Sequence, residues 1–547
     1  MLLQNFFEES VERFPDKVAL IHKGERVTYR EINERANRVA VLLQAKGIER
    51  GDRVAIFLDN SVESVISLFG ILKADAVFLM LSAQLKTRKL IYILNDCKAS
   101  GLIIHTDKLD IIRGHFGSLP SVKCTVLVGN NEKLSSTDCP NPVTWRELEN
   151  VRVPKTLPPG PYALGPTPCA LHPAPCSFNP APYTLRPAPS HNIDLDLATI
   201  IYTSGSTGNP KGVMLTHLNM MSAATSITTY LGNVPEDVII NVLPLSFDYG
   251  LYQVLTTFKF GGTIVLERSF AYPYEAIKQM VKERVTGFPG VPTIFAILLQ
   301  MEDLGRYDLN CLRYITNTAA ALPIEHIQKL RKVFPQAKLY SMYGLTECKR
   351  VSYLPPEELD RCPGSVGRGM PNEEVWIVDE NGNRVGSGVV GELVVRGSNV
   401  MRGYWGDPET TDKVLRSGPL PGEKVLYTGD LFKTDEEGFL YFVGRKDDMI
   451  KTRGERVSPK EVENAIYGLE SIGEVAVIPV ADDILGQAIK AFVVPRNGFV
   501  LSEKDVLKHC KKELEELAIP KYVEFRNVLP KNPSGKIDKL KLKEEAR

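Results

Sequence analysis

At residues 203–211 the chain reads T-S-G-S-T-G-N-P-K, a stretch dense in hydroxyl groups that ends on a lysine. An apolar run at residues 198–202 predicts a buried strand before it, and we expect a helix over residues 212–224 after it. Glycines permit tight turns that expose backbone N–H groups, and hydroxyls and a lysine add further donors. The pattern predicts a phosphate-binding loop, although its spacing differs from G-x-x-x-x-G-K-[ST]. A flexible surface loop is the alternative interpretation.

The composition is that of a globular protein with more than one domain. The chain has 547 residues, of which 43% are hydrophobic and 24% charged. Basic and acidic residues both number 66, which argues against nucleic-acid or anionic-membrane binding. The nine cysteines form no C-x-x-C pair, so we expect free thiols in a reducing compartment. The sequence shows neither a signal peptide nor a transmembrane segment, and we expect a cytoplasmic protein.

Helix and strand patterns alternate over the first 355 residues, outside one insertion, and this favours an α/β fold with parallel sheets. We expect a large N-terminal domain at residues 1–445, made of two α/β subdomains with parallel-rich sheets and a small β-barrel-like subdomain. A charged turn at residues 444–448 then leads into a small, mobile α+β domain at residues 446–547.

Residues 154–191 interrupt this alternation with a proline-rich repeat of seven residues. Prolines open each unit and recur at its sixth position, a spacing that excludes a helix or a central strand. We therefore expect a disordered surface loop inserted into the large domain. A docking site for a proline-recognising partner is the functional alternative.

Four more motifs carry groups suited to nucleotide chemistry. Y-G-L-T-E at residues 343–347 offers a carboxylate for Mg²⁺ and a ring that can stack on a base. Y-T-G-D at residues 427–430 offers a carboxylate to ribose hydroxyls. G-R-K-D at residues 444–447 is a charged linker, and P-K-N-P-S-G-K-I at residues 530–537 holds a lysine in a Gly/Pro-framed loop. Each motif alone is compatible with a solvated turn or tail.

Taken together and in this order, the five motifs resemble the AMP-forming adenylating superfamily. Its members include acyl-CoA synthetases, nonribosomal-peptide adenylation domains and firefly luciferase, and this chain is most similar to a free-standing acyl-CoA synthetase. The resemblance runs from about residue 13 to residue 543 and implies ATP, Mg²⁺ and coenzyme A as cofactors. The implied reaction is adenylation of a carboxylic acid with release of pyrophosphate, followed by transfer of the acyl group to coenzyme A.

The resemblance implies a role for each residue at a matching position. Lys536, Glu347 and Thr346 are the expected catalytic residues, and Glu347 is the expected Mg²⁺ ligand. Lys536 would bridge the substrate carboxylate and the nucleotide, and Asp447 would be the hinge of the small domain. The residues expected to bind ATP or AMP are Thr203, Ser204, Gly205, Ser206, Thr207, Gly208, Lys211, Asn317, Thr318, Ala319, Ala320, Tyr343, Gly344, Asp430 and Arg445.

The resemblance also divides these positions between parts of the substrates. The loop at residues 203–211 would hold the β- and γ-phosphates, and Tyr343 and residues 317–320 would flank the adenine. Asp430 and Arg445 would hold the ribose. The residues expected to line the substrate pocket are Phe247, Asp248, Tyr249, Gly290 and Met342. The residues expected to contact coenzyme A are Lys451 and Gly454.

Some positions depart from the pattern of acyl-CoA synthetases. Phe247 stands where many members have a histidine, and Asp75 stands where a glycine is usual. Asp248 matches an aspartate that pairs with the substrate's α-ammonium in amino-acid-activating members, or it could cap the helix that follows. The alternative function is therefore an amino-acid-activating enzyme that loads a separate acyl or peptidyl carrier protein. A nucleotide-binding protein without turnover is a third hypothesis.

Overall fold

The structure is a computed structural model that describes residues 1–129, 139–152, 190–203, 210–301, 303–318, 322–446, 448–452, 455–482, 486–496, 498–532 and 535–546. These residues form two compact units, one of Met1–Leu20 and Glu25–His217 and the other of Ile21–Gly24 and Leu218–Arg547. Most of the proline repeat expected at residues 154–191 lies outside the described residues.

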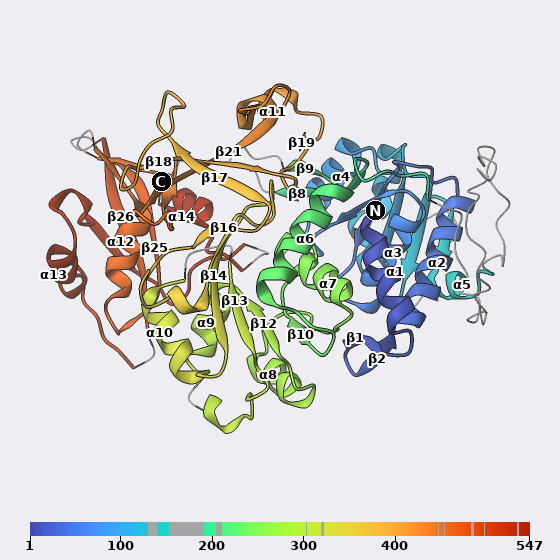
Figure 1. Cartoon of the computed structure of the whole chain (residues 1–547), viewed down its shortest axis with the longest axis horizontal. Coiled ribbons are helices and arrows are strands. Elements are labelled where there is room, and N and C mark those ends of the chain that lie inside the picture. Colours follow the sequence, from blue (N-terminus) through green and yellow to red (C-terminus); the bar gives the residue numbers. More distant parts are fainter. Residues whose placement is uncertain are drawn as a thin grey trace, which may run out of the picture. The chain divides into compact units, whose positions relative to one another are not determined.

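The first unit, drawn largely in blue in Figure 1, is built on a mainly parallel sheet in which the strands follow the order β9-β8-β4-β3-β5-β6-β7. Its strands are β3 (Arg53–Phe57), β4 (Val77–Met80), β5 (Gly101–His105), β6 (Cys124–Val128), β7 (Pro142–Thr144), β8 (Leu197–Thr203) and β9 (Lys211–Thr216). The central strands are apolar except for Arg53 at the start of β3 and His105 at the end of β5, as expected for a parallel sheet with both faces covered. The parallel α/β alternation predicted for this region is therefore confirmed.

Helices join these parallel strands and pack against one another. The helices are α1 (Leu3–Arg13), α2 (Tyr29–Ala45), α3 (Val62–Lys73), α4 (Thr87–Asp96) and α5 (Trp145–Glu149), and β1 (Val18–His22) and β2 (Glu25–Thr28) precede α2. Thr28 caps α2 by accepting from the N–H of Glu31, whose carboxylate accepts from the N–H of Thr28 in return. Helix α3 lies against α2 so closely that a Cβ on Gly70 would meet Val39 at 2.5 Å.

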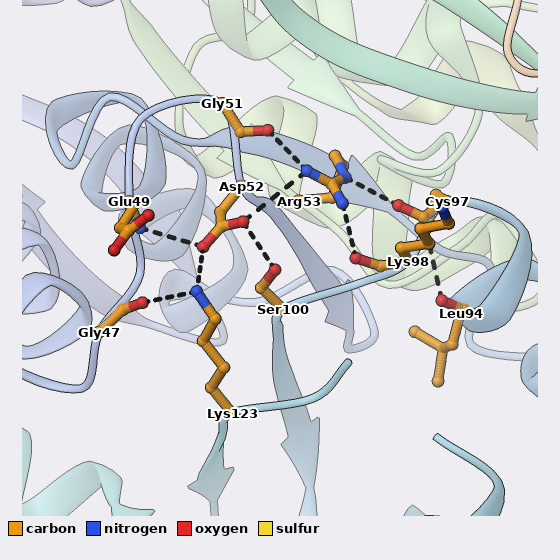
Figure 2. Close-up of polar contacts among 10 residues, drawn as sticks. All are labelled: Gly47, Glu49, Gly51, Asp52, Arg53, Leu94, Cys97, Lys98, Ser100 and Lys123. Carbon is orange, nitrogen blue, oxygen red and sulfur yellow. Dashed lines mark hydrogen bonds and ion pairs between the residues drawn. The ribbon is translucent and has the colours of Figure 1, made fainter. Parts of the chain in front are cut away.

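A polar cluster ties together the amino-terminal ends of β3, β5 and β6 (Figure 2). Asp52 accepts hydrogen bonds from the Ser100 hydroxyl at 2.8 Å and from the Lys123 ammonium at 2.8 Å. Burial alone would raise the pKa of Asp52, but these bonds hold it below its usual value. Arg53 donates to the carbonyl oxygens of Cys97 and Lys98, just past the end of α4, where a cation is favoured. The cluster therefore fixes the end of helix α4 and the amino-terminal ends of three neighbouring strands relative to one another.

The helix predicted over residues 212–224 begins later than expected. Residues Lys211–Thr216 instead form strand β9, which pairs antiparallel with β8 in a hairpin, and helix α6 spans His217–Leu231. K-G-V-M-L-T turns its side chains to alternate faces and can therefore complete the sheet edge beside β8. The stretch at residues 203–211 thus connects strands β8 and β9 and does not lead directly into a helix.

The second unit contains a parallel sheet whose carboxyl ends carry several of the predicted site residues. Its parallel strands are β11 (Thr263–Leu266), β10 (Val238–Asn241), β12 (Gly287–Gly290), β13 (Tyr314–Asn317) and β14 (Lys338–Tyr343), in that order, followed by antiparallel β15 (Ser352–Leu354) and β16 (Arg368–Gly369). The connecting helices are α7 (Asp248–Phe260), α8 (Pro273–Lys282), α9 (Pro292–Leu298) and α10 (Ile324–Val333).

A curled antiparallel sheet follows, in agreement with the predicted β-rich subdomain. It contains β17 (Glu373–Val378), β18 (Gly391–Gly397), β21 (Lys424–Thr434), β20 (Leu415–Ser417) and β22 (Leu440–Arg445). Its register shifts at Glu392 and again at Leu431, and such bulges increase the bend of a sheet. The short strand β19 (Gly403–Tyr404) and helix α11 (Pro408–Val414) lie between β18 and β20 in the sequence.

The C-terminal part is α+β, as predicted. Strands β24 (Glu455–Val457), β23 (Ile450–Thr452), β26 (Gly486–Pro495), β25 (Ile472–Asp482) and β27 (Tyr522–Phe525) form its sheet, with helices α12 (Pro459–Tyr467), α13 (Glu503–Glu513) and α14 (Lys539–Glu545). Ile466, Val477, Ile489 and Val506 belong to one buried cluster between the sheet and its helices.

The seven cysteines within the described ranges are all free thiols, in line with the expectation from their spacing. Among the same residues, no helix has both the length and the apolar character needed to cross a membrane.

Candidate adenylation site

Asp430 is the centre of a polar network on the curled sheet. It lies on β21 directly opposite Arg445 on β22, and the Arg445 Nε is 2.9 Å from its Oδ1. The Tyr343 hydroxyl donates to its Oδ2 at 2.6 Å. Burial raises the pKa of Asp430, and Arg445 opposes that rise. The structure thus brings together three residues from three motifs that are as much as 102 positions apart in the sequence.

Tyr343 ends β14 with its ring among aromatic side chains. Its ring centroid lies 4.8 Å from Phe432 in an edge-on arrangement and 6.4 Å from Phe442 in a stacked one. These contacts fix the ring plane at the carboxyl edge of the parallel sheet, where ligands bind in open α/β sheets. The predicted residues Gly290 and Asn317 end the neighbouring strands β12 and β13 and are register partners at the same edge.

Glu392 holds the turn that carries Asp430. Its Oε1 accepts from the Gly429 N–H at 3.0 Å, and its Oε2 pairs with the Lys446 ammonium at 3.0 Å. The N–H of Lys446 also donates to the Gly429 carbonyl. One buried carboxylate therefore fastens the Y-T-G-D turn to the charged linker.

Glu347 is held from two sides. Its Oε1 accepts from the Tyr404 hydroxyl at 2.8 Å, and its carbonyl accepts from the Met401 N–H at 2.7 Å. Burial raises the pKa of the Glu347 carboxyl, while the Tyr404 bond works against that rise. A lone carboxylate fits Mg²⁺, which takes one or two carboxylates and completes its shell with phosphate oxygens. No group of three or more metal-binding side chains occurs among the described residues.

Lys536 lies in a small C-terminal loop, where its carbonyl accepts from the Asn532 N–H at 2.8 Å. Asn532 shapes this loop, because its side-chain oxygen accepts from the Lys536 N–H at 3.0 Å. Thr293, at the start of α9, donates to the Gly535 carbonyl at 2.9 Å and so docks the loop against the parallel-sheet part of this unit. The Lys536 ammonium lies 5.6 Å from the centroid of the Phe247 ring.

The charges around Lys536 come from the same motifs. Burial lowers the pKa of its ammonium, Asp248 is the strongest opposing influence, and Asp430 and Glu347 also favour the charged form. Arg445 adds to the lowering. The expected catalytic lysine therefore shares its electrostatic environment with the residues expected to hold the nucleotide and Mg²⁺.

The predicted substrate-pocket residues Asp248 and Tyr249 both lie beside Lys349, a cation that the sequence analysis did not single out. The Lys349 ammonium is 3.5 Å from Asp248 Oδ2, and the two side chains are only 2% and 9% exposed. Burial lowers the pKa of Lys349 to about 7, although Asp248 opposes this change. The only sequence signal for Lys349 was a lysine two residues after Y-G-L-T-E, and its partner lies 101 positions away.

The alternative of Asp248 as a helix cap is wrong. Phe247 occupies the capping position of α7 and makes no side-chain cap bond, whereas Asp248 is the first helical residue. Its carboxylate still benefits from the positive end of the helix, but its close partner is Lys349. Tyr249 follows, with its hydroxyl bonded to the Thr316 backbone at 3.0 Å.

The remaining predicted residues divide into three groups. Met342 and Thr318 are buried, and Gly344 and Thr346 follow β14 within the second unit. Thr203 and Lys211 lie in the first unit, where they are register partners at the ends of the β8–β9 hairpin. The predicted residues outside the described part are Ser204, Gly205, Ser206, Thr207, Gly208, Ala319, Ala320, Asp447 and Gly454; Lys451 lies in β23, but its side chain is also outside it.

Comparisons with known sequences agree with this geometry. The AMP-binding enzyme family model matches residues 7–405, and that of the AMP-binding enzyme C-terminal domain matches residues 461–536. The chain is 34% identical to a long-chain-fatty-acid–CoA ligase of Bacillus subtilis (strain 168), over 99% of this chain and 94% of that protein. It is 29% identical to gramicidin S synthase 2 of Brevibacillus brevis, over 99% of this chain but 11% of that protein.

Solved structures point the same way. The anthranilate CoA ligase AuaEII in complex with anthranoyl-AMP matches with a TM-score of 0.86 and 26% identity, over 100% of this chain and 97% of that one. ATP-bound MatB from Rhodopseudomonas palustris matches with a TM-score of 0.82 and 28% identity, over 100% and 99%. These findings confirm the expected α/β fold, the binding of ATP and the class of AMP-forming acyl-CoA ligases. The chain belongs to the AMP-binding enzyme family.

Proposed function

We propose that this acyl-CoA ligase adenylates a carboxylic acid with Lys536 as its catalytic lysine and then transfers the acyl group to coenzyme A. The observation that carries the proposal is the shared environment of Lys536, Asp248, Asp430 and Glu347, in which the lysine, Asp430 and Glu347 come from three separate motifs. A site that only binds phosphate or a nucleotide would need no lysine beside the buried carboxylates of Asp248 and Asp430. The proposed domain boundary remains at residues 445 and 446, with Asp447 as the hinge and Lys451 and Gly454 at coenzyme A.

The proposed chemistry follows from the charges. A carboxylate that attacks the α-phosphate brings two anions together, and the Lys536 ammonium offsets their repulsion. Tyr343 offers a stacking face for the adenine, and Asp430 accepts from the ribose hydroxyls. Glu347 would hold Mg²⁺, which stabilises negative charge on the phosphates when it is bound. The loop at residues 203–211 would hold the departing pyrophosphate.

The substrate is a separate question, and the relatives give two candidate classes. The Bacillus subtilis relative is named for long-chain fatty acids, whereas the Brevibacillus brevis relative is named gramicidin S synthase 2, and the amino-acid alternative rests on Asp248. We propose a fatty or other simple acid as the substrate and free coenzyme A as the acceptor. Pyrophosphate release across fatty, aryl and amino acids, with and without coenzyme A, separates these classes. Activity with amino acids alone, and no thioester product, would contradict the proposal.

The role of Lys536 is tested by separating the two half-reactions. Lys536→Ala should reduce adenylation by about a thousandfold or more, because an oriented cation is lost from the transition state. The same variant should still form the thioester from preformed acyl-adenylate and coenzyme A, since that step no longer needs this lysine. Lys531→Ala is the matched control, because Lys531 lies in the same loop as Lys536 but pairs with Glu474 on β25. Normal adenylation by Lys536→Ala would remove Lys536 from the mechanism.

A further inference from the structure

The Asp248–Lys349 pair is built into the substrate-pocket side of the proposed site. Asp248 is flanked by Phe247, whose ring lies beside Lys536, and by Tyr249. The Lys349 ammonium lies 5.2 Å from the centroid of the Tyr249 ring and 4.7 Å from that of Tyr252. Two aromatic faces and one carboxylate therefore hold this ammonium away from water.

The backbone conformation also fixes the position of Lys349. Lys349 has a φ of 60°, in the left-handed region that a lysine adopts only when its surroundings impose it. The chain passes so close to Gly344 that a Cβ there would meet the Lys349 carbonyl oxygen at 2.3 Å. Val351 then donates to the Tyr343 carbonyl. The turn after Y-G-L-T-E thus presents Lys349 to Asp248 at a fixed position.

The cations nearby would oppose a second ammonium. Lys349, Lys536 and the buried Arg350 all act on this pocket, and the Arg350 guanidinium lies 5.3 Å from the Tyr249 ring centroid. Asp248 is the carboxylate that faces two of them. An α-ammonium on a substrate would have to share Asp248 with Lys349 and would meet like charges at close range.

We propose that Lys349 is a specificity-determining residue that occupies Asp248 in place of a substrate ammonium and so restricts the enzyme to carboxylic acids without an α-amino group. This inference rests on the proposed adenylating function and deepens it. Asp248 then serves as an internal counter-ion in this chain. Lys349 would thus exclude an α-ammonium in two ways, because it repels the like charge and because it already occupies Asp248.

The experiment compares acids that differ only in the α-amino group. The two pairs are octanoate with 2-aminooctanoate and 3-phenylpropanoate with phenylalanine, and the readout is kcat/KM for pyrophosphate release. The enzymes are the wild type, Lys349→Met, Lys349→Arg and the double variant Asp248→Asn with Lys349→Met. Lys349→Gln serves as the second neutral variant if Lys349→Met fails to fold.

The wild type should prefer the acid without the amino group in both pairs. Lys349→Met leaves Asp248 without its internal cation, so this preference should fall by at least about tenfold. Lys349→Arg keeps the cation and should therefore keep the wild-type preference. The double variant lacks both charges, so it should show the preference for acids without an amino group again, because no carboxylate remains to attract an ammonium. A merely structural lysine would lower all rates without changing the ratios.

Two results would overturn the inference. One is a wild type that prefers the amino acids, and the other is a neutral Lys349 variant that folds and keeps the wild-type ratios. Failure of the proposed adenylating function looks different, because then no acid of either kind would release pyrophosphate in any variant.

Discussion

Single hydrogen bonds set the protonation of the site, and Tyr404 is the clearest case. Its hydroxyl donates to Glu347 and lowers the pKa of a carboxyl that burial has raised. Tyr404→Phe removes this bond, so the pKa of Glu347 should rise further and its ionised form should persist only at higher pH. We therefore expect the acid limb of the pH profile of adenylation to move to higher pH, with a loss of about tenfold at neutral pH.

The measurement is pyrophosphate release from about pH 5 to pH 9. Tyr272→Phe is the control, because Tyr272 is 78% exposed and should leave the profile unchanged. An acid limb at the same pH in Tyr404→Phe and the wild type would show that the bond does not tune Glu347.

Lys349 should give stability an uncommon pH dependence. The pKa of Lys349 is about 7 in the folded protein, whereas an unfolded lysine titrates at about 10.4. Between these values the unfolded chain binds more protons, so the free energy of unfolding owed to Lys349 rises with pH. The melting temperature of the wild type minus that of Lys349→Met should therefore increase from about pH 7 to pH 9. Lys504→Met, at an exposed position, should show a flat difference, and a flat or falling difference for Lys349→Met would contradict the lowered pKa.

At the scale of elements, close backbone contacts decide where the sequence tolerates no change. Gly367 has a φ of 85°, and a Cβ at this position would lie 1.7 Å from the Tyr353 carbonyl oxygen on β15. Gly367→Ala should lower the free energy of unfolding by about 2–4 kcal/mol, because strand β15 would have to move. Gly386→Ala, where a Cβ meets nothing within 4 Å, is the matched control for thermal unfolding. Equal melting temperatures for the two variants would show that the close contact of Gly367 with β15 does not limit stability.

The hairpin β8–β9 shows where reading elements from sequence fails. Lys211–Thr216 alternates between sheet faces over six residues, a signal too short to separate from the helix that begins at His217. The helix predicted over residues 212–224 therefore included most of this strand. Pairing with β8, which is a tertiary contact, decided the outcome.

At the scale of the molecule, the repeat should be dispensable. The chain returns from it at Ser190 and His191, which both donate to the Asp75 carboxylate, and Asp75 has a φ of 60°. Deletion of residues 161–189 keeps these anchors, and loop length changes stability only slowly, by about 0.6 kcal/mol per doubling. Adenylation within about twofold of the wild type is expected, with an unchanged melting temperature. A folded but inactive deletion would show that the repeat takes part in function.

Helix and strand alternation predicted the fold class, and the resemblance carried by the five ordered motifs implied that Tyr343, Asp430, Arg445 and Lys536 serve one site. The sequence did not predict Lys349 beside Asp248, Tyr404 on Glu347 or Thr293 on the Lys536 loop. These partners lie 57 to 242 positions apart and belong to no local pattern. Only the packing of the elements brings them together.

The bonds of Asp430 bear on how the nucleotide leaves. Without any ligand, its Oδ2 already accepts from the Tyr343 hydroxyl, and its Oδ1 lies 2.9 Å from the Arg445 Nε in an ion pair. A ribose that binds here exchanges or shares existing hydrogen bonds, so its net gain is smaller than the contacts alone would suggest. When AMP leaves, the Asp430 carboxylate would again contact Tyr343 and Arg445, so it would not remain buried without a partner. Under the proposed ribose-binding role of Asp430, product release would therefore cost less, and the ribose subsite would contribute to turnover as well as to recognition.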